Sequence, residues 1–401
     1  MFAKRVLLFA LVLSLALVSA CAPAPTPTPV PTATPLPTAT RVPPTATPVP
    51  PTATATPVPP TATPTRVPPT ATPTPLAELV PTTIPITGTL AHPRSEISGL
   101  AWSGDNLILL TQYPDFEKRR NLAPDAPQAI FAIPKADILA VLDGGRKDAI
   151  VPKRVRWIDE DLIKKVDAEG FNFQGYESIV IVGDAVYVTI ETQNKTNANL
   201  MQGYLLAGKI AADASTITID TTKMTPIKAA APLNNMCFES MFAAGDKLIA
   251  LYEANGSGIN ASPVGIVFDQ KTLAQTGTLP FPNVDYRLTD ATALDSAGKF
   301  WMPNYHFPGE TELLKAPRVD AIATKFKQGT THAQFVQVER FVEFQYTATG
   351  ITLVDRAPVQ LQLIDKDTAR NWEGLVRLDN RGLLVATDSF PTTILAFIPI
   401  K

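Results

Sequence analysis

Acidic residues that open short apolar segments are the residues best suited to chemistry in this sequence. Five segments share one pattern: an acid, a mainly apolar run, a turn, a second apolar run, and a closing polar residue fourteen to sixteen positions after the acid. The opening acids are Glu96, Glu177, Glu239, Asp290 and Glu373, and the closing residues are Gln112, Glu191, Glu253, Asn304 and Asp388. Because antiparallel strands joined by a turn bring their outer ends together, each acid should lie beside the polar residue that closes its segment.

The oxygen atoms of these side chains favour a hard divalent cation. The chain has only three histidines and two cysteines, so Ca²⁺, with Mg²⁺ as the alternative, fits this donor set better than zinc. The expected metal ligands are Glu96, Glu177, Glu191, Glu239, Glu253, Asp290, Asn304, Glu373 and Asp388. The competing interpretation is structural, with each acid accepting hydrogen bonds from backbone N–H groups of the neighbouring sheet. Since like charges raise one another's pKa, clustered acids need either cations or arginines beside them.

Cationic side chains fall near the same strand ends. They are Arg94, Lys118, Arg119, Arg120, Arg287 and Arg370, and His306 lies two residues after Asn304. Acids beside arginines suit a metal-dependent hydrolase of anionic phosphoesters or carboxylate esters. The expected catalytic residues are Glu177, Glu239, Glu373, Arg370 and His306. Simple solvation is the alternative for the charged run at residues 118–120. No nucleophile elbow, HExxH motif, P-loop or Rossmann glycine pattern occurs.

The spacing of the five segments predicts the fold class. Short alternating runs such as ESIVIVGDAVYVTIE indicate antiparallel strands, with one short helix expected over residues 159–170. Hairpins that recur every 51 to 83 residues predict an all-β fold, a β-propeller of five blades with large insertions in blades one and four. A sixth blade in the strand-rich segment 338–364 is the alternative. The last blade lacks an outer strand, which the segment TTIPITGTL (82–90) would supply to close the ring.

The N-terminal region predicts export. Lys4 and Arg5 precede an apolar run too short to span a bilayer comfortably, which is typical of a signal peptide over residues 1–20. Val18–Ser19–Ala20–Cys21 resembles the lipobox of bacterial lipoproteins, which implies a lipid on Cys21 and an anchor on the outer face of the cell membrane; an ordinary signal peptide is the alternative. Residues 21–81, rich in Pro and Thr, predict a polyproline II or disordered linker, and residues 82–401 the propeller. A net charge of −2 argues against nucleic acid as a partner.

Two of the segments resemble a known family. EISGLAW and NWEGLVRL are similar to recurrent motifs of the phytase-like propeller family described as having esterase-like activity. The resemblance implies a propeller that hydrolyses phosphoesters, esters or lactones at the cell surface, although few lysines accompany the acids, unlike in the calcium-dependent phytases of this type. In the similar gluconolactonase-like propellers, Glu, Asn and Asp hold a divalent ion, parts that Glu177, Asn304 and Asp388 could take. The alternative is a non-catalytic extracellular propeller that binds a small anion or a surface glycan.

Overall fold

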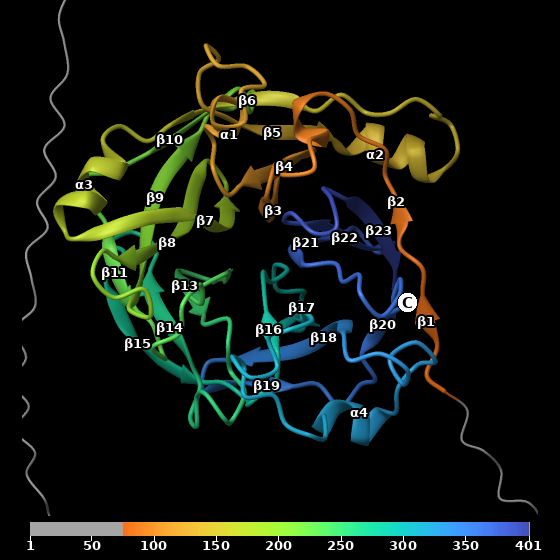
Figure 1. Ribbon diagram of the computed structural model, residues 1–401. Coiled ribbons are helices and arrows are strands. Elements are labelled where there is room, and N and C mark those ends of the chain that lie inside the picture. Colours follow the sequence, from red (N-terminus) through yellow and green to blue (C-terminus); the bar gives the residue numbers. More distant parts are fainter. Residues whose placement is uncertain (1–74, 401) are drawn as a thin grey trace, which may run out of the picture. The chain divides into compact units, whose positions relative to one another are not determined.

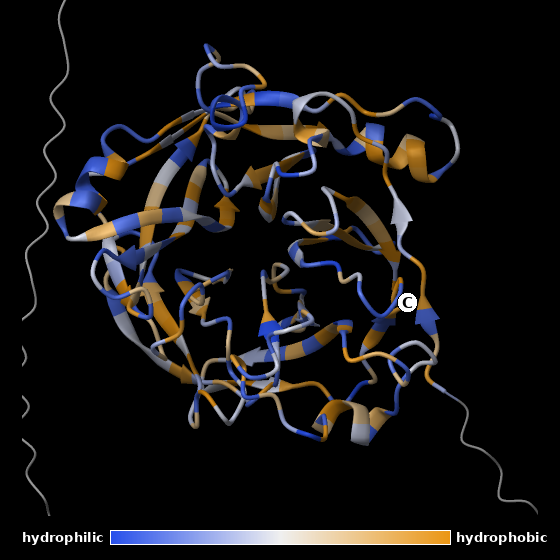
Figure 2. Cartoon of the chain, in the orientation of Figure 1, coloured by the Kyte–Doolittle hydropathy of each residue, from blue (hydrophilic) through white to orange (hydrophobic). Residues whose placement is uncertain are grey.

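Short apolar strands and tight turns fold residues 75–400, the part of the chain that this computed structural model describes, into sheets arranged around a common axis (Figure 1). The signal peptide, Cys21 and most of the predicted linker lie outside the described residues. Apolar and polar residues alternate along many of the strands (Figure 2), as expected when one face of a strand packs against the next sheet. No helix of residues 75–400 is long and apolar enough to cross a membrane.

The first two blades are joined at their outer edges. Blade one contains β3 (Ile97–Ser103), β4 (Asn106–Thr111), β5 (Ala129–Pro134) and β6 (Lys153–Ile158), with α1 (Phe116–Arg119) and α2 (Lys135–Leu142) in its insertions. Blade two contains β7 (Phe171–Val182), β8 (Ala185–Asn194), β9 (Met201–Ile210) and β10 (Thr216–Ile219), preceded by α3 (Leu162–Ala168) and extended by β11 (Thr225–Lys228). Outer strands β6 and β10 pair in parallel, so the two blades form one nine-stranded sheet.

The other three blades follow in chain order. Blade three contains β12 (Ser240–Ala244), β13 (Lys247–Leu251), β14 (Val264–Asp269) and β15 (Gln275–Pro280). Blade four contains β16 (Arg287–Leu288), β17 (Lys299–His306), β18 (Val338–Thr347), β19 (Gly350–Leu353) and β20 (Val359–Leu361), with α4 (Ala321–Phe326) in its insertion. Blade five contains β21 (Trp372–Leu378), β22 (Gly382–Thr387) and β23 (Leu395–Pro399).

The beginning of the described chain closes the ring. Strand β2 (Thr82–Thr83) pairs antiparallel with β23, which confirms the predicted outer strand of blade five. Strand β1 (Glu78–Leu79) pairs in parallel with β20, so contacts with blade four begin ahead of the predicted start at Thr82. A 3-10 turn, η1 (Thr89–Ala91), then leads into blade one. Together these strands cover the edges of blades four and five.

Most of the predicted architecture is confirmed. The segment 338–364 supplies β18, β19 and β20 of blade four, so the fold has five blades and not six. Helix α3 occupies the expected position. The fourth hairpin differs, because its first strand, β16, ends before Asp290, and residues 290–295 contact β17 only irregularly, through Thr292 and Asp295.

The core lies between neighbouring blades. Phe242 of blade three packs against Phe300 of blade four at 4.5 Å between ring centroids, and Phe300 stacks on Phe344 at 5.4 Å. Cys237 is fully buried and has a free thiol. Contacts of this kind recur from blade to blade and fix the relative positions of the innermost strands.

Candidate active site at the channel mouth

Local backbone irregularities aim the acids of the innermost strands at the axis. The pairing register of β7 with β8 skips at Glu177, and that of β21 with β22 skips at Glu373. Such β-bulges turn one side chain out of the regular alternation of a strand. Gly374 follows Glu373 because a Cβ atom there would lie 2.8 Å from Leu100 Cγ of blade one. In the sequence Glu373–Gly374–Leu375, the first residue is thus the acid at the β-bulge, and the glycine after it lets blade five approach blade one closely.

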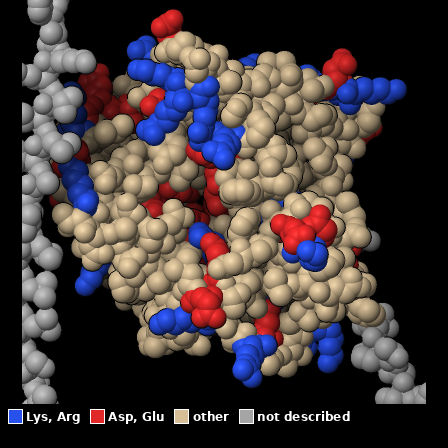
Figure 3. Space-filling view, in the orientation of Figure 1, with Lys and Arg blue, Asp and Glu red and all other residues tan. Residues whose placement is uncertain are grey.

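Six carboxyl groups from three blades converge at one end of the axis. Glu177, Glu191, Glu239 and Glu253 are buried, whereas Glu373 and Asp388 are partly exposed. Their mutual electrostatic influence shows that they form one cluster. Acidic side chains occupy the hollow at the centre of the face seen in Figure 3, with basic side chains farther out. The predicted convergence is therefore present for these six residues.

Burial and mutual repulsion make these carboxyl groups hold their protons. Burial, followed by the charges of neighbouring acids, raises the pKa of Glu177, Glu239 and Glu373 well above their ordinary range. The same two causes raise the pKa of Glu191 to about 8. Burial raises the pKa of Glu253 to about 7 and that of Asp388 to about 6. The cluster therefore contains both protonated and ionised carboxyl groups near neutral pH.

Arg287 is the cation of the cluster. Its guanidinium is buried and forms an ion pair with Glu253, and Nη1 lies 3.9 Å from Glu239 Oε1. On its outer side, Nη2 donates to Glu310 Oε1 at 2.6 Å and Nε to Glu310 Oε2 at 3.0 Å. The sequence alone does not decide whether metal cations or arginine side chains balance the acids. Arg287 balances Glu253 and lies near Glu239, so an arginine balances part of the cluster.

A cavity of about 200 Å³ opens beside this guanidinium. Glu373 and Asp388 both line it, together with Arg287, Tyr305, Glu310, Asn371 and three further residues. Tyr305 donates its hydroxyl to Glu373 Oε1 at 3.2 Å. Asn371 Nδ2 donates to Asp388 Oδ2 at 3.0 Å and lies 3.5 Å from Glu373 Oε1, so one amide orients both acids. Ser389 donates a further hydrogen bond to Asp388 Oδ2, at 2.9 Å.

Four carboxylate oxygens of the cluster are buried without a hydrogen-bond partner. They are Glu191 Oε1, Glu239 Oε2, Glu253 Oε2 and Asp388 Oδ1. Their chemistry suits a hard cation or the hydroxyl groups of a ligand. However, no group of three or more acids, histidines or cysteines within residues 75–400 is arranged to hold a metal ion. The donors thus fit Ca²⁺ or Mg²⁺ in type but form no ready-made coordination site, and the cation stays a prediction of the sequence.

Several predicted site residues are held in structural contacts instead. Asp290 accepts hydrogen bonds from the backbone N–H groups of Ala291 and Leu375, both at 2.7 Å, and of Leu100 at 3.3 Å. It therefore ties blades one, four and five together, as in the structural interpretation of the acids. Asn304 Nδ2 donates to the carbonyls of Asp285 and Arg287, and its Oδ1 accepts from Arg340 at 2.8 Å, so the amide is held in place by structural contacts.

Two predicted catalytic residues also lie outside the cluster. Arg370 donates to Glu339 Oε2 at 2.7 Å and to the carbonyl of Gln362, which positions the loop before β21. His306 points to the other side of β17, where Nδ1 contacts the carbonyl of Val336 and Nε2 contacts the hydroxyl of Thr311. Neither side chain touches the acids. The structure therefore does not bring these two side chains together with the acids, because their partner groups come from other segments of the chain.

At the rim of the cluster, Glu96 and Gln112 have separate partners. Glu96 Oε1 accepts from Arg120 at 2.9 Å, which gives the basic loop after β4 a specific contact. Gln112 donates to Glu177 Oε1 at 3.2 Å, which confirms that two hairpin ends meet at this face. No pattern in the sequence selects Tyr305 or Glu310. Asn371 could have been found, because it precedes the WEGL motif directly.

Comparisons with known proteins support no family assignment. No protein-family model and no curated protein matches the sequence. The phytase-like resemblance therefore stays a prediction.

Solved structures show a likeness in fold alone. An exo-beta-1,3-galactanase from Phanerochaete chrysosporium has a TM-score of 0.44 at 10% identity, with 80% of this chain and 64% of that chain covered. This chain therefore spans less than two thirds of the galactanase. A GH43 endo-arabinanase from Bacillus licheniformis has a TM-score of 0.42 at 9% identity, covering 78% and 94%. The soluble aldose sugar dehydrogenase from Escherichia coli has 0.38 at 10% identity, covering 78% and 99%.

Proposed function

We propose that the propeller is a hydrolase that uses Glu373 and Asp388 as an acid and base pair at the channel mouth. The proposal rests on one observation: these two carboxyl groups line the same cavity, share the amide of Asn371, and have pKa values that their surroundings separate. Asp388, with a pKa of about 6, is mostly ionised near neutral pH. Its negative charge is one reason why the pKa of Glu373 is raised so far. A separated pair of this kind is the usual mark of acid and base roles.

The geometry supports a division of labour between the two groups. Glu373, protonated, would donate its proton to the oxygen of the leaving group, while Asp388 would accept the proton of a water molecule that attacks the other side of the bond. Tyr305 and Asn371 would hold Glu373 in place through the contacts described above. The products are an alcohol and either an acid or a hemiacetal, so the chemistry suits an ester or a glycosidic bond.

The charge of the mouth favours a substrate without negative charge near the reacting bond. Arg287 is already engaged by Glu253 and Glu310, and the remaining acids of the cluster face no comparable cation within it. A phosphoester would therefore be repelled unless a divalent cation were bound with it. Ca²⁺ or Mg²⁺ would supply that positive charge and polarise a substrate oxygen. Assays with a chelator and with added Ca²⁺ distinguish the two substrate classes.

The test uses the full chain on a panel of chromogenic esters, phosphoesters and neutral glycosides. We expect turnover of neutral substrates without added metal, with a fall in kcat/KM as pH drops below about 6, since Asp388 must lose its proton. Glu373→Gln and Asp388→Asn should each lower kcat by about 10²-fold or more. Asp184→Asn, a change of an exposed acid that pairs with Lys209 away from the mouth, is the matched control. Full activity in both mouth variants would refute the assignment.

A non-catalytic binding protein for a neutral polyhydroxylated ligand, such as a surface glycan, is the second candidate. The four buried carboxylate oxygens without partners favour it, because ligand hydroxyls could satisfy them. It predicts retention of a glycan without turnover. Loss of that retention in a Glu177→Ala, Glu373→Ala double variant would place the ligand at the mouth, whereas unchanged retention would place it elsewhere.

A further inference from the structure

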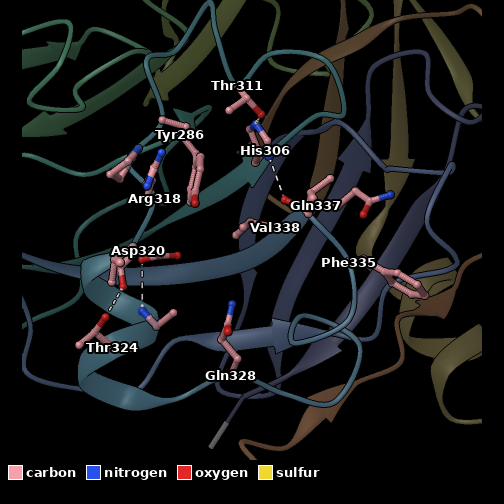
Figure 4. A pocket seen from close by; sticks show the side chains of 15 residues that line it. Tyr286, His306, Thr311, Arg318, Asp320, Thr324, Gln328, Phe335, Gln337 and Val338 are labelled. Atoms are coloured by element: carbon pink, nitrogen blue, oxygen red, sulfur yellow. Dashed lines mark hydrogen bonds between the residues drawn. The ribbon is translucent and has the colours of Figure 1, made fainter.

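A second cavity lies beside the channel mouth, within the insertion of blade four. Its volume is about 450 Å³, and its walls come from α4 and from the loops around residues 311–320 and 328–338 (Figure 4). Small-molecule sites typically enclose about 300–1,000 Å³. The mouth cavity falls below that range and the second cavity falls within it. The flanking cavity therefore has room for a small-molecule unit that the mouth cavity alone does not accommodate.

Strand alternation makes the two cavities neighbours. On β17, Tyr305 faces the mouth cavity and the next residue, His306, faces the flanking cavity. The same switch occurs at the start of β16, between Arg287 and Tyr286. Because successive side chains of a strand point to opposite sides, a single pair of strands separates the cavities. The loop after β17 forms the top of this wall, since Phe307 and Glu310 line the mouth cavity and Thr311 the flanking one.

The flanking cavity offers hydrogen-bonding groups and one exposed cation, Arg318, rather than excess acid (Figure 4). The hydroxyl of Tyr286 has no hydrogen-bond partner within residues 75–400 and points across the cavity towards α4 (Figure 4). The side chain of Gln328 points into the cavity from below, and its Nε2 donates to the carbonyl of His332 at 3.3 Å (Figure 4). Asp320, the acid on the cavity wall, is neutralised by Arg340 at 2.6 Å. Donors and acceptors beside apolar side chains suit the hydroxyl groups and C–H faces of a sugar-like ring.

Tyr286 is also held in an unusual backbone conformation. Its φ of 71° lies in the left-handed region, which bulky residues rarely occupy and which costs on the order of 1–3 kcal/mol. Its ring packs against His306 at 4.9 Å between centroids, and His306 is fixed in turn by Val336 and Thr311. His306, predicted as catalytic, is thus a positioning residue for the tyrosine. These contacts hold the Tyr286 hydroxyl in one place.

We propose that the flanking cavity is a second subsite, which binds the next unit of a neutral, polyhydroxylated oligomer whose reacting bond lies at the mouth. The inference rests on the proposed function and specifies its substrate class as an oligosaccharide. Binding should therefore strengthen with chain length, because a disaccharide fills the mouth alone while longer chains also reach the flanking cavity.

The test measures binding of neutral gluco-, xylo-, galacto- and arabino-oligosaccharides, from disaccharide to hexasaccharide, by calorimetry on the full-length Glu373→Gln variant. We expect at least one series to gain about tenfold or more in affinity with length, equivalent to ~1.4 kcal/mol. Thr324→Trp, which adds bulk from the exposed face of α4 into the cavity, should abolish that gain and leave disaccharide binding unchanged. Ala321→Trp, on the same helix but outside the cavity lining, should keep the gain. Gln328→Leu removes an amide without adding bulk and should reduce the gain.

The outcomes separate this inference from the proposed function. The second subsite would be overturned if no series binds or if affinity does not depend on chain length. It would also be overturned if the gain in affinity with length survives Thr324→Trp, or if Ala321→Trp loses as much of that gain as Thr324→Trp does. If binding depends on length and Thr324→Trp abolishes that dependence, but the wild-type chain cleaves no substrate, the subsite is upheld and the hydrolase is refuted. If long substrates are cleaved and Thr324→Trp does not change the rate, the hydrolase is upheld and the second subsite is refuted.

Discussion

Replacing Arg287 with methionine would test whether this guanidinium balances the channel acids. The side chain is 7% exposed and pairs with Glu253, which is fully buried, and with Glu310. Removing one partner of a buried pair typically costs about 3–5 kcal/mol, because the remaining charge is uncompensated. Arg287 lowers the pKa of Glu253, so its loss should raise that pKa above about 7 and make the carboxyl take up a proton. Each unit of pKa change corresponds to ~1.4 kcal/mol.

The sign of the pH dependence follows from the direction of these shifts. A carboxyl whose pKa is higher in the folded than in the unfolded chain contributes stability at low pH, and that contribution is lost as pH rises through the folded-state pKa. Urea unfolding of full-length Arg287→Met should therefore show a loss of about 3–5 kcal/mol near pH 8 and a clearly smaller loss near pH 5.5. The added substitution Glu253→Gln should restore part of the stability at the higher pH.

The matched control is Arg318→Met. Arg318 is exposed and has no ion pair within residues 75–400, so its replacement should change the free energy of unfolding by less than about 0.5 kcal/mol. An Arg287→Met variant as stable as wild type near pH 8 would refute the electrostatic account. So would an equal loss of stability at both pH values, since that would indicate a packing defect rather than an unbalanced charge.

Three further predictions concern other parts of the chain. The wild-type chain should unfold more easily in urea near pH 8 than near pH 6, because the raised pKa values of Glu191 (about 8) and Glu253 (about 7) are folded-state properties; a flat profile would contradict these shifts. Asp290→Ala should destabilise the fold by about 3 kcal/mol or more, since it leaves the N–H groups of Leu375 and two other residues without an acceptor; a loss under about 1 kcal/mol would contradict its role as a tie between blades. Cys21→Ser should move the exported protein from the membrane to the soluble fraction, as cell fractionation would show, because the lipid on Cys21 is the proposed anchor; retention at the membrane would favour another anchor.

The repeat pattern predicted the architecture because strand alternation and turn spacing are local properties of the sequence. The blade number, the ring closure by residues 82–83 and the convergence of acids such as Glu177 and Glu373 all follow from them. The fourth repeat shows the limit of this reasoning. Asp290 matches the pattern as well as the other acids do, but it adopts a φ of 54° and turns its carboxylate to backbone N–H groups of two other blades.

Long-range partners explain the other differences. Arg370 and His306 have side chains suited to catalysis, yet each is occupied by a group that the sequence places about thirty residues away. Conversely, Arg287 reaches Glu253 because strand β16 lies directly beside the end of blade three, where Leu288 N donates to the Glu253 carbonyl at 3.0 Å. A one-dimensional pattern contains the residue types and their spacing. It does not contain the competition between nearby acceptors for the same side chain.

The closure of the ring makes the order of synthesis matter for folding. Strand β2 is among the first parts of the described chain to emerge, but its partner β23 is among the last, and β1 also waits for β20. Blades four and five consequently stay open until the last strands of the chain have been made, which favours slow, late closure over folding blade by blade. The last step of folding is therefore the pairing of the first strands of the described chain with strands of the last two blades.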